Sequence, residues 1–458
     1  HYTIRGNELI YVGEDGYEQG LQENVFFDPI TKGIVYDNTN YWMDPWMKRL
    51  DYEYSATEIS KGVVRILDTV ANALPKPGWI FATKGQKMPN RISPAIHAIF
   101  SSDIKISDVN IYHAGSMGLI AEGSRNIDLN RFNVILAPQS TRFMTSAADA
   151  THFVGCQGNI TLKDCLFENM HDDGVNIHGT YTMVDNSIDN KTIGIRLMHK
   201  QQHGFTFARS GDSIRLVDRT TLLPYACLKV KDIKAINEEY SHLIFNEDVV
   251  KILKPNTALE NISQYPEKVL IKGCTIRNNR ARGILISTPG QVEITDNFFS
   301  NEMAAISIGG DANFWWESGP VNNVLIKNNK FYNCCITKQN QAVIMIQPKI
   351  LKQEESSGFY ERNIRIENNI FETFDNMILT ANSVDGLKFN YNQIIKTKNF
   401  TPFYPNDPAI KIKNSNNLEI LKNTYSGDKT AFIELDGRAK IKIIKGNNGF
   451  SKNLSLIK

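Results

Sequence analysis

Residues 323–331 read NVLIKNNKF, and residues 363–371 repeat the pattern as NIRIENNIF. In both stretches apolar side chains occupy every second position of a short run, two polar residues follow, and a further apolar position closes the pattern. A period of two is typical of a strand, and paired asparagines are typical of a tight turn. The pattern therefore predicts a short strand, a turn and the start of a second strand.

Further copies of this pattern begin at residues 103, 126, 159, 268, 291, 386, 417 and 440. Four of the steps between successive copies are 23 residues long, and the other steps fit the same coil with an insertion. Short strands that recur at such a period are typical of a parallel β-helix, in which each coil stacks on the preceding one. We therefore predict an all-β chain built on a parallel β-helix.

Superposing the coils brings one mostly polar column together. It consists of Phe132, Cys165, Cys274, Asn297, Asn329, Asn369, Asn392 and Asn423. Asparagines that only marked turns would not stay in register, so the column predicts a ladder of hydrogen-bonded amides. Cys165 and Cys274 are predicted to be small buried thiols of the same column.

The longest step predicts an inserted subdomain. Alternating segments such as KTIGIRLMH fall between residues 181 and 265, which are expected to form a small antiparallel β-subdomain. Residues 1–70 are expected to form a β-rich N-terminal segment, with NELIYVG and GIVYDN as hairpin strands and TEISKGVVRIL leading into the helix. The β-helix itself is expected over residues 71–180 and 266–458.

Composition excludes several classes of function. The 458 residues include 51 basic and 49 acidic side chains, and no basic stripe indicates a nucleic-acid partner. No apolar run approaches the roughly 18 residues that span a bilayer. The six cysteines contain no CxxC pair, and no dinucleotide, phosphate or Ser-His-Asp motif is present, so we expect neither a cofactor nor a metal. The oligomeric state stays open.

The run MHDDGVNIHG at residues 170–179 sets Asp172 and Asp173 side by side, and the coil alignment gives them a third carboxylate. Asp149 lies 23 residues before Asp172, which is one coil, and neighbouring coils are about 4.8 Å apart. The alignment predicts one column of Ser116, Asp149, Asp172 and Ala281, and a second of Met117, Ala150, Asp173 and Arg282.

Three carboxylates this close cannot all ionise comfortably, so one is expected to keep its proton to higher pH. A hydrolase that uses general acid–base catalysis needs one neutral and one charged carboxyl group. We therefore expect Asp149, Asp172 and Asp173 to be catalytic. Two alternatives stay open: aspartates that only cap a turn, and a calcium site, which the adjoining histidines fit poorly.

Further residues are expected on this face as ligands of a substrate. One column consists of Glu122, Gly155, His178 and Ser287. Glu122 and His178 could hydrogen-bond a hydroxyl group or be satisfied structural groups, and Arg282 could bind substrate or pair with the aspartates. One of Trp315 and Trp316 is expected to be exposed, because an indole offers a flat apolar face to a sugar.

Three long motifs resemble glycoside hydrolase family 110. They are DATHFVGCQGNITLKDCLFENMHDDGVNIHGTY at residues 149–181, NNRARGILIST at 278–288 and GGDANFWWESG at 309–319. The resemblance implies a right-handed β-helix and an inverting exo-α-1,3-galactosidase that acts on blood group B determinants or linear α-1,3-galactosyl glycans. It maps the family's essential carboxylates onto Asp149, Asp172 and Asp173. It also implies an exported, periplasmic or extracellular protein, although the sequence begins at His1 without a secretion signal.

A similar trio in polygalacturonases, another β-helix family, suggests the roles. By that resemblance Asp172 protonates the glycosidic oxygen, while Asp149 and Asp173 activate water. Inverting enzymes hold acid and base roughly 6.5–9.5 Å apart, which is farther than the alignment places these residues. Two other functions remain: a polygalacturonase-like hydrolase or lyase, and a carbohydrate-binding solenoid without catalysis.

Overall fold

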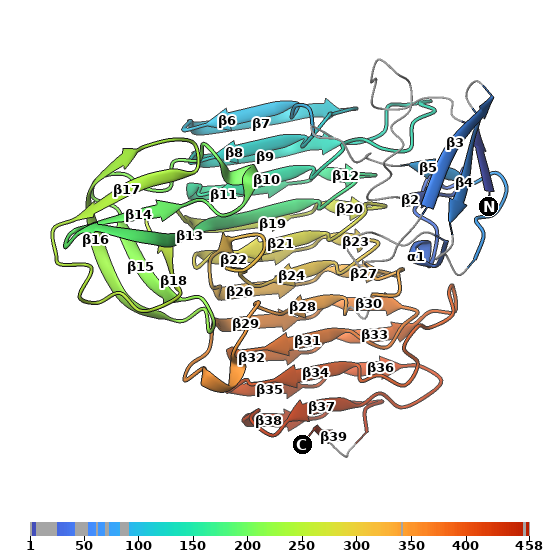
Figure 1. Ribbon diagram of the computed structural model, residues 1–458. Helices are drawn as coiled ribbons and strands as arrows, with labels where there is room; N and C mark the ends of the chain where they lie inside the picture. Colours follow the sequence, from blue (N-terminus) through green and yellow to red (C-terminus); the bar gives the residue numbers. More distant parts are fainter. Residues whose placement is uncertain are drawn as a thin grey trace.

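The computed structural model describes residues 2–5, 25–41, 54–60, 63–68, 73–82, 91–339, 342–451 and 455–457. Parallel coils stack into one long solenoid, a small barrel projects from one side of it, and N-terminal strands lie against the other end of the coils (Figure 1). The predicted parallel β-helix is confirmed. Among the described residues no helix is long and apolar enough to cross a membrane.

The first of three parallel sheets carries the site described below. Its strands are β6 (Ile96–Ile99), β8 (Leu119–Glu122), β10 (Thr151–Val154), β13 (Val175–Asp189), β21 (Ile284–Ser287), β24 (Ile306–Ile308), β28 (Ile344–Ile346), β31 (Leu379–Asn382), β34 (Ile410–Lys413), β37 (Ile433–Asp436) and β39 (Ser455–Ile457).

The second sheet consists of β7 (Ser102–Ile111), β9 (Arg125–Val134), β11 (Gln157–Lys163), β19 (Pro266–Lys272), β22 (Gln291–Thr295), β26 (Asn322–Lys327), β29 (Glu361–Glu367), β32 (Val384–Asn390), β35 (Leu418–Leu421) and β38 (Ile441–Lys445). The third consists of β12 (Leu166–Glu168), β20 (Thr275–Arg277), β23 (Phe298–Ser300), β27 (Lys330–Tyr332), β30 (Ile370–Thr373), β33 (Gln393–Lys396) and β36 (Thr424–Ser426). The long strand β9 continues into the third sheet, where Val134 pairs with Phe167 of β12.

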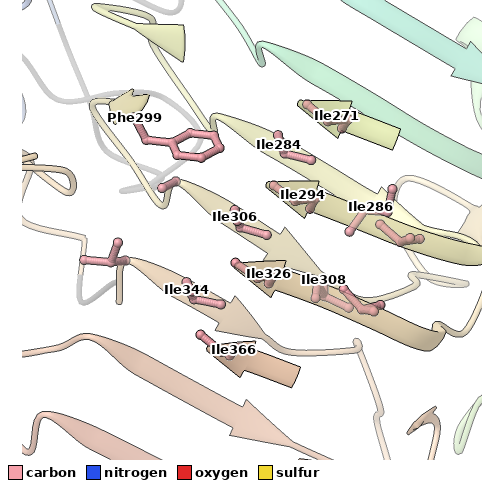
Figure 2. Close-up of a cluster of buried hydrophobic side chains, with 14 of the residues drawn as sticks. Ile271, Ile284, Ile286, Ile294, Phe299, Ile306, Ile308, Ile326, Ile344 and Ile366 are labelled. Carbon is pink, nitrogen blue, oxygen red and sulfur yellow. The ribbon is translucent and has the colours of Figure 1, made fainter. Parts of the chain in front are cut away.

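The core lies between the sheets and is built from like residues in successive coils. Figure 2 shows isoleucine columns from the second sheet and from the first sheet. Their members pair in register: Ile271, Ile294, Ile326 and Ile366 in one, and Ile284, Ile306 and Ile344 in the other. Each of these isoleucines therefore packs against an isoleucine one coil away, which explains why the sequence keeps its period.

The predicted asparagine ladder is confirmed at the bend between the second and third sheets. Amide-to-amide distances from Nδ2 to the next Oδ1 are 2.9, 3.0, 3.0, 3.1 and 2.8 Å along Asn297, Asn329, Asn369, Asn392, Asn423 and Asn447. Cys165 and Cys274 occupy the same column as buried free thiols. Residues just before the ladder, such as Asp296 and Asn328, have positive φ angles of 60° and 58°, which turn the chain sharply.

The segment expected to hold an inserted subdomain forms an antiparallel barrel. Strand β13 leaves the helix and closes a ring with β14 (Thr192–Arg196), β17 (Tyr240–Phe245), β16 (Pro224–Ala235), β15 (Ser213–Asp218) and β18 (Thr257–Asn261). Its interior is apolar and includes Phe207, Leu216 and Phe245. A short 3₁₀ helix, η2 (Lys200–Gln202), lies in the loop between β14 and β15, and a second one, η3 (Gln353–Glu355), precedes β29.

The N-terminal segment differs in detail from its predicted strands. The run NELIYVG lies outside the described residues. GIVYDN is not a strand: Ile34 makes only an isolated bridge to Phe27, and the chain then turns at Asp37, which has a φ of 56°, into α1 (Asn38–Tyr41).

The run TEISKGVVRIL does not lead into the helix. It folds back as an antiparallel hairpin of β3 (Tyr54–Ser60) and β4 (Val63–Asp68), and β1 (Tyr2–Arg5) pairs with β4. A second pair, β2 (Val25–Phe27) and β5 (Ile80–Ala82), is also antiparallel.

Candidate active site

The candidate site lies on the first sheet, where β10, β13 and β21 begin. Asp149 stands two residues before β10, Asp173 two residues before β13, and Arg282 two residues before β21. Because the three strands are parallel and adjacent, their leading residues meet at one edge. The outer face of the same strands presents His152 and His178, whose neighbours Phe153 and Ile177 point into the core.

The structure corrects the predicted register of Asp149 by one residue. Thr151 pairs with Val175, a separation of 24 residues, so Asp149 lies opposite Asp173 rather than Asp172. The extra residue falls after β10, where the pairing of β11 shifts beside Gly158, which has a φ of 65°. Counting back from β11 therefore shifted the residues of this one coil that precede the bulge, such as Asp149, by one position.

The same shift replaces Gly155 by Val154 in the column that contains Glu122 and His178. For the following coil the predicted register is correct, because Val175 pairs with Ile284 and so Asp173 stands opposite Arg282.

Asp173 and Arg282 form a buried two-point ion pair. The guanidinium donates from Nε to Oδ1 at 2.8 Å and from Nη2 to Oδ2 at 2.6 Å, and the Arg282 backbone N–H also donates to Oδ1 at 2.8 Å. Burial raises the pKa of Asp173 to about 7, against the lowering effect of Arg282, and nearby Asp172 and Asp149 raise it further. Both oxygens of Asp173 are therefore held by Arg282.

Asp149 is bound to a pair of histidines. Its Oδ2 lies 2.6 Å from His152 Nδ1, and its Oδ1 accepts the Asp173 backbone N–H at 3.2 Å. His152 Nε2 lies 2.8 Å from His178 Nε2. Burial lowers the pKa of His152, but the hydrogen bond and charge of Asp149 more than offset this and leave the pKa above its ordinary value.

Asp172 is the most accessible of the three carboxylates. Its side chain is 15% exposed, against 5% for Asp149 and 1% for Asp173. Its Oδ2 accepts a hydrogen bond from Arg91 Nη2 at 2.7 Å. A group that approaches from solvent therefore reaches Asp172 first.

The three aspartates come together, and their partners argue for proton chemistry. One oxygen from each lies within 4.8 Å of the others, a spacing that a cation could accept. However, Arg91, Arg282 and His152 already place donors on all three carboxylates. A set of carboxylates that already accept from these donors does not fit a metal site. The same donors do hold the three carboxylates together in a small volume.

Three residues of this site were not predicted. Arg91 and His152 contact the aspartates directly. Glu317, in β25 (Glu317–Ser318), lies 3.5 Å from His178 Nε2 because β25 pairs antiparallel with β13. Only His152, three residues after Asp149 on a strand, carried a local signal; the other two are brought in by chain connections that the period does not describe.

The predicted ligand residues differ in position. Glu122 lies two strands from His178 and its carboxylate is 2.6 Å from His97 Nε2. Trp316 is buried against Tyr181 and Tyr360, so it offers no exposed face to a sugar. Trp315 is half-buried and lies 5.3 Å, ring to ring, from His199 of the barrel loop. Of the two tryptophans, Trp315 is the one that a ligand could reach.

Comparison with known proteins agrees with this architecture. Three family models match: GLAA-B beta-barrel domain I over residues 1–81, GLAA-B beta-barrel domain II over residues 192–259, and a right-handed beta helix region over residues 260–448. The second match coincides with the barrel that interrupts the helix. The third confirms the right-handed hand of the solenoid.

Curated relatives match nearly the whole chain. Alpha-1,3-galactosidase A of Shewanella woodyi is 30% identical over 95% of this chain and 70% of that protein. Alpha-1,3-galactosidase B of Bacteroides thetaiotaomicron is 32% identical over 93% and 68%, and an alpha-1,3-galactosidase B of Phocaeicola vulgatus is 37% identical over 92% and 72%. The chain belongs to the α-1,3-galactosidase family of glycoside hydrolases.

Proposed function

We propose that this protein is an inverting exo-α-1,3-galactosidase that releases terminal α-1,3-linked galactose from glycans. The observation that carries the proposal is the trio of Asp149, Asp172 and Asp173, whose oxygens lie within 4.8 Å of one another where β10 and β13 begin. The names of the curated relatives support the bond and the sugar. The substrates proposed are blood group B determinants and linear α-1,3-galactosyl glycans.

Asp172 is proposed as the general acid, because it is the most accessible carboxylate of the trio. It gives its proton to the glycosidic oxygen as the bond from that oxygen to C1 breaks. Asp149 is proposed as the base that takes a proton from the water whose oxygen bonds to C1. Solvent then returns a proton to Asp172 and removes one from Asp149. Asp173 has both oxygens on Arg282, which supports a role in fixing the trio rather than in proton transfer.

The distance that inversion requires between acid and base suggests a role for the contact between Arg91 and Asp172. Acid and base stand roughly 6.5–9.5 Å apart in inverting enzymes. The oxygens of the trio are closer, within 4.8 Å of one another. Asp172 would therefore exchange its contact with Arg91 for one with the glycosidic oxygen, and turn away from Asp149 as the substrate enters.

Trp315 and the barrel loop that carries His199 are proposed to hold the sugar next to the galactose. The two rings are 5.3 Å apart and belong to different parts of the chain, the solenoid and the inserted barrel. An apolar ring face suits the C–H face of a sugar. Because the proposed substrates are glycans of the kind that cell surfaces carry, we also propose that the protein acts outside the cytoplasm.

The stereochemistry can be read directly by NMR. Galactosyl-α-1,3-galactose is mixed with the protein and the anomeric proton signals are followed from the first minute. We expect β-galactose to appear before mutarotation produces the α anomer. Initial release of α-galactose would exclude inversion, and no release from this disaccharide or from the blood group B trisaccharide would exclude the proposed activity.

A further inference from the structure

Both histidines beside Asp149 have a hydrogen-bond partner at each ring nitrogen. His178 Nδ1 lies 2.6 Å from the backbone oxygen of Gly179, and its Nε2 lies 2.8 Å from His152 Nε2. His152 Nδ1 lies 2.6 Å from Asp149 Oδ2. These contacts form one continuous chain from a backbone carbonyl to a proposed catalytic carboxylate.

The carbonyl of Gly179 fixes the direction of that chain. A carbonyl oxygen can only accept a hydrogen bond, so His178 must carry a proton on Nδ1. A neutral imidazole then has a lone pair on Nε2, which can only accept. With His178 neutral, His152 donates from Nε2, and its Nδ1 faces Asp149 with one proton between the two groups. Glu317 Oε1 lies farther from His178 Nε2, at 3.5 Å, than the 2.8 Å of His152 Nε2.

We propose that His178 is a positioning residue that locks His152 in this state, so that the proton on His152 Nδ1 faces Asp149. The inference rests on the proposed function for its catalytic meaning, but its geometry does not depend on it. His178 would touch neither the substrate nor the reacting atoms. It would act through His152, by keeping the proton on the nitrogen that faces Asp149.

The charges around the pair favour the same assignment. Burial lowers the pKa of His152, but the hydrogen bond and charge of Asp149 and the charge of Glu317 raise it above its ordinary value, with Arg91 opposing them. Burial lowers the pKa of His178, with His152 acting in the same direction and Glu317, Asp149 and the Gly179 carbonyl opposing it. We therefore assign the shared proton to His152 and a neutral ring to His178.

Histidine tautomers can be measured without any activity. Long-range ¹H–¹⁵N NMR on protein labelled at its nine histidines distinguishes the two neutral forms from the cation, and the His152→Gln and His178→Gln variants assign the signals. We expect His178 to be neutral with its proton on Nδ1, and His152 to remain protonated on both nitrogens above its ordinary titration range. A His178 that carries its proton on Nε2, or is itself the cation, would overturn the proposal.

Kinetics test the catalytic meaning of the lock. His178→Gln keeps an acceptor for His152 and a donor for Gly179, whereas His178→Leu removes both. For the leucine variant we expect kcat to fall roughly tenfold to hundredfold with little change in KM. The alkaline limb of its pH profile should move down by about half a unit to one unit, because the imidazolium of His152 loses a charge-assisted hydrogen bond.

The glutamine variant should recover most of kcat and of the pH profile. Equal unfolding temperatures of the two variants exclude a difference in folding. A glutamine variant as impaired as the leucine variant, or a fully active leucine variant, would contradict the positioning role. If the wild-type protein showed no galactosidase activity, only the proposed function would be refuted. The NMR experiment would still decide the protonation states of the two histidines.

Discussion

Glu361 in β29 gives a quantitative prediction about pH and stability. Its side chain is fully buried, and one carboxylate oxygen accepts the Val321 backbone N–H at 2.6 Å. In the described part of the chain it has no ion pair. Burial raises the pKa of Glu361 from 4.5 to about 8, and the Val321 hydrogen bond only partly opposes this. Val321 follows the loop that carries Trp315 and Glu317, so this carboxyl anchors one side of the site.

The sign of the effect follows from the direction of the shift. The folded-state pKa lies above the unfolded value, so the contribution to stability is complete below pH 4.5 and is lost as pH rises to about 8. At about 1.4 kcal/mol per unit, the wild type should lose about 3 kcal/mol of unfolding free energy between pH 5.5 and pH 8 through this one group.

Glu361→Gln removes that dependence, because the amide cannot ionise and its carbonyl can still accept the Val321 N–H. Urea unfolding followed by circular dichroism at several pH values measures the difference between the two slopes. Glu372→Gln is the matched control: it removes a carboxylate of the third sheet that pairs with Lys330 at 2.9 Å, and it should keep the wild-type slope. Parallel slopes for Glu361→Gln and the wild type would refute the reasoning.

Three further comparisons distinguish residues of the site from residues that stabilise the fold. Asn369→Ala removes the ladder hydrogen bonds to Asn329 and Asn392 and leaves buried amide groups unpaired, so urea unfolding should show a loss of about 2–4 kcal/mol. The control Asn322→Ala, at an exposed position, should cost less than about 1 kcal/mol. Equal costs would contradict a stabilising role of the ladder. Trp316→Ala should destabilise the fold by about 3–5 kcal/mol, because its side chain is buried. Trp315→Ala should instead raise KM several-fold with little change in unfolding temperature. The reverse pattern would show that the two tryptophans were assigned wrongly. Arg282→Lys keeps the charge but loses the two-point contact with Asp173, so kcat should fall by about a hundredfold. An unchanged kcat would show that Arg282 is not needed to position the site.

The solenoid could be predicted from the sequence because its stabilising contacts repeat with the chain. Ile294 packs on Ile326 and Asn329 bonds Asn369, and both relations follow from superposing coils. The N-terminal segment has no such repetition. Its strands pair antiparallel through local turns, and the hairpin of β3 and β4 could not be distinguished from a strand that enters the helix.

The site was predictable to the extent that it follows the register. Asp173 and Arg282 were placed opposite each other correctly, but one bulge beside Gly158 moved Asp149 from Asp172 to Asp173. Glu317 enters by an antiparallel pairing with β13, and Arg91 precedes the first strand of the helix, β6. Contacts of this kind depend on tertiary connections, which a periodic pattern does not encode.

The central claim is that Asp172 protonates the leaving oxygen of an α-1,3-galactoside. Its most direct test compares Asp172→Asn with the wild type on galactosyl-α-1,3-galactose and on α-galactosyl fluoride, whose leaving group needs little protonation. We predict a loss of roughly 10²–10⁴-fold on the disaccharide and a much smaller loss on the fluoride. If Asp172→Asn lost the same factor on both substrates, or released galactose from the disaccharide at the wild-type rate, the account would be contradicted.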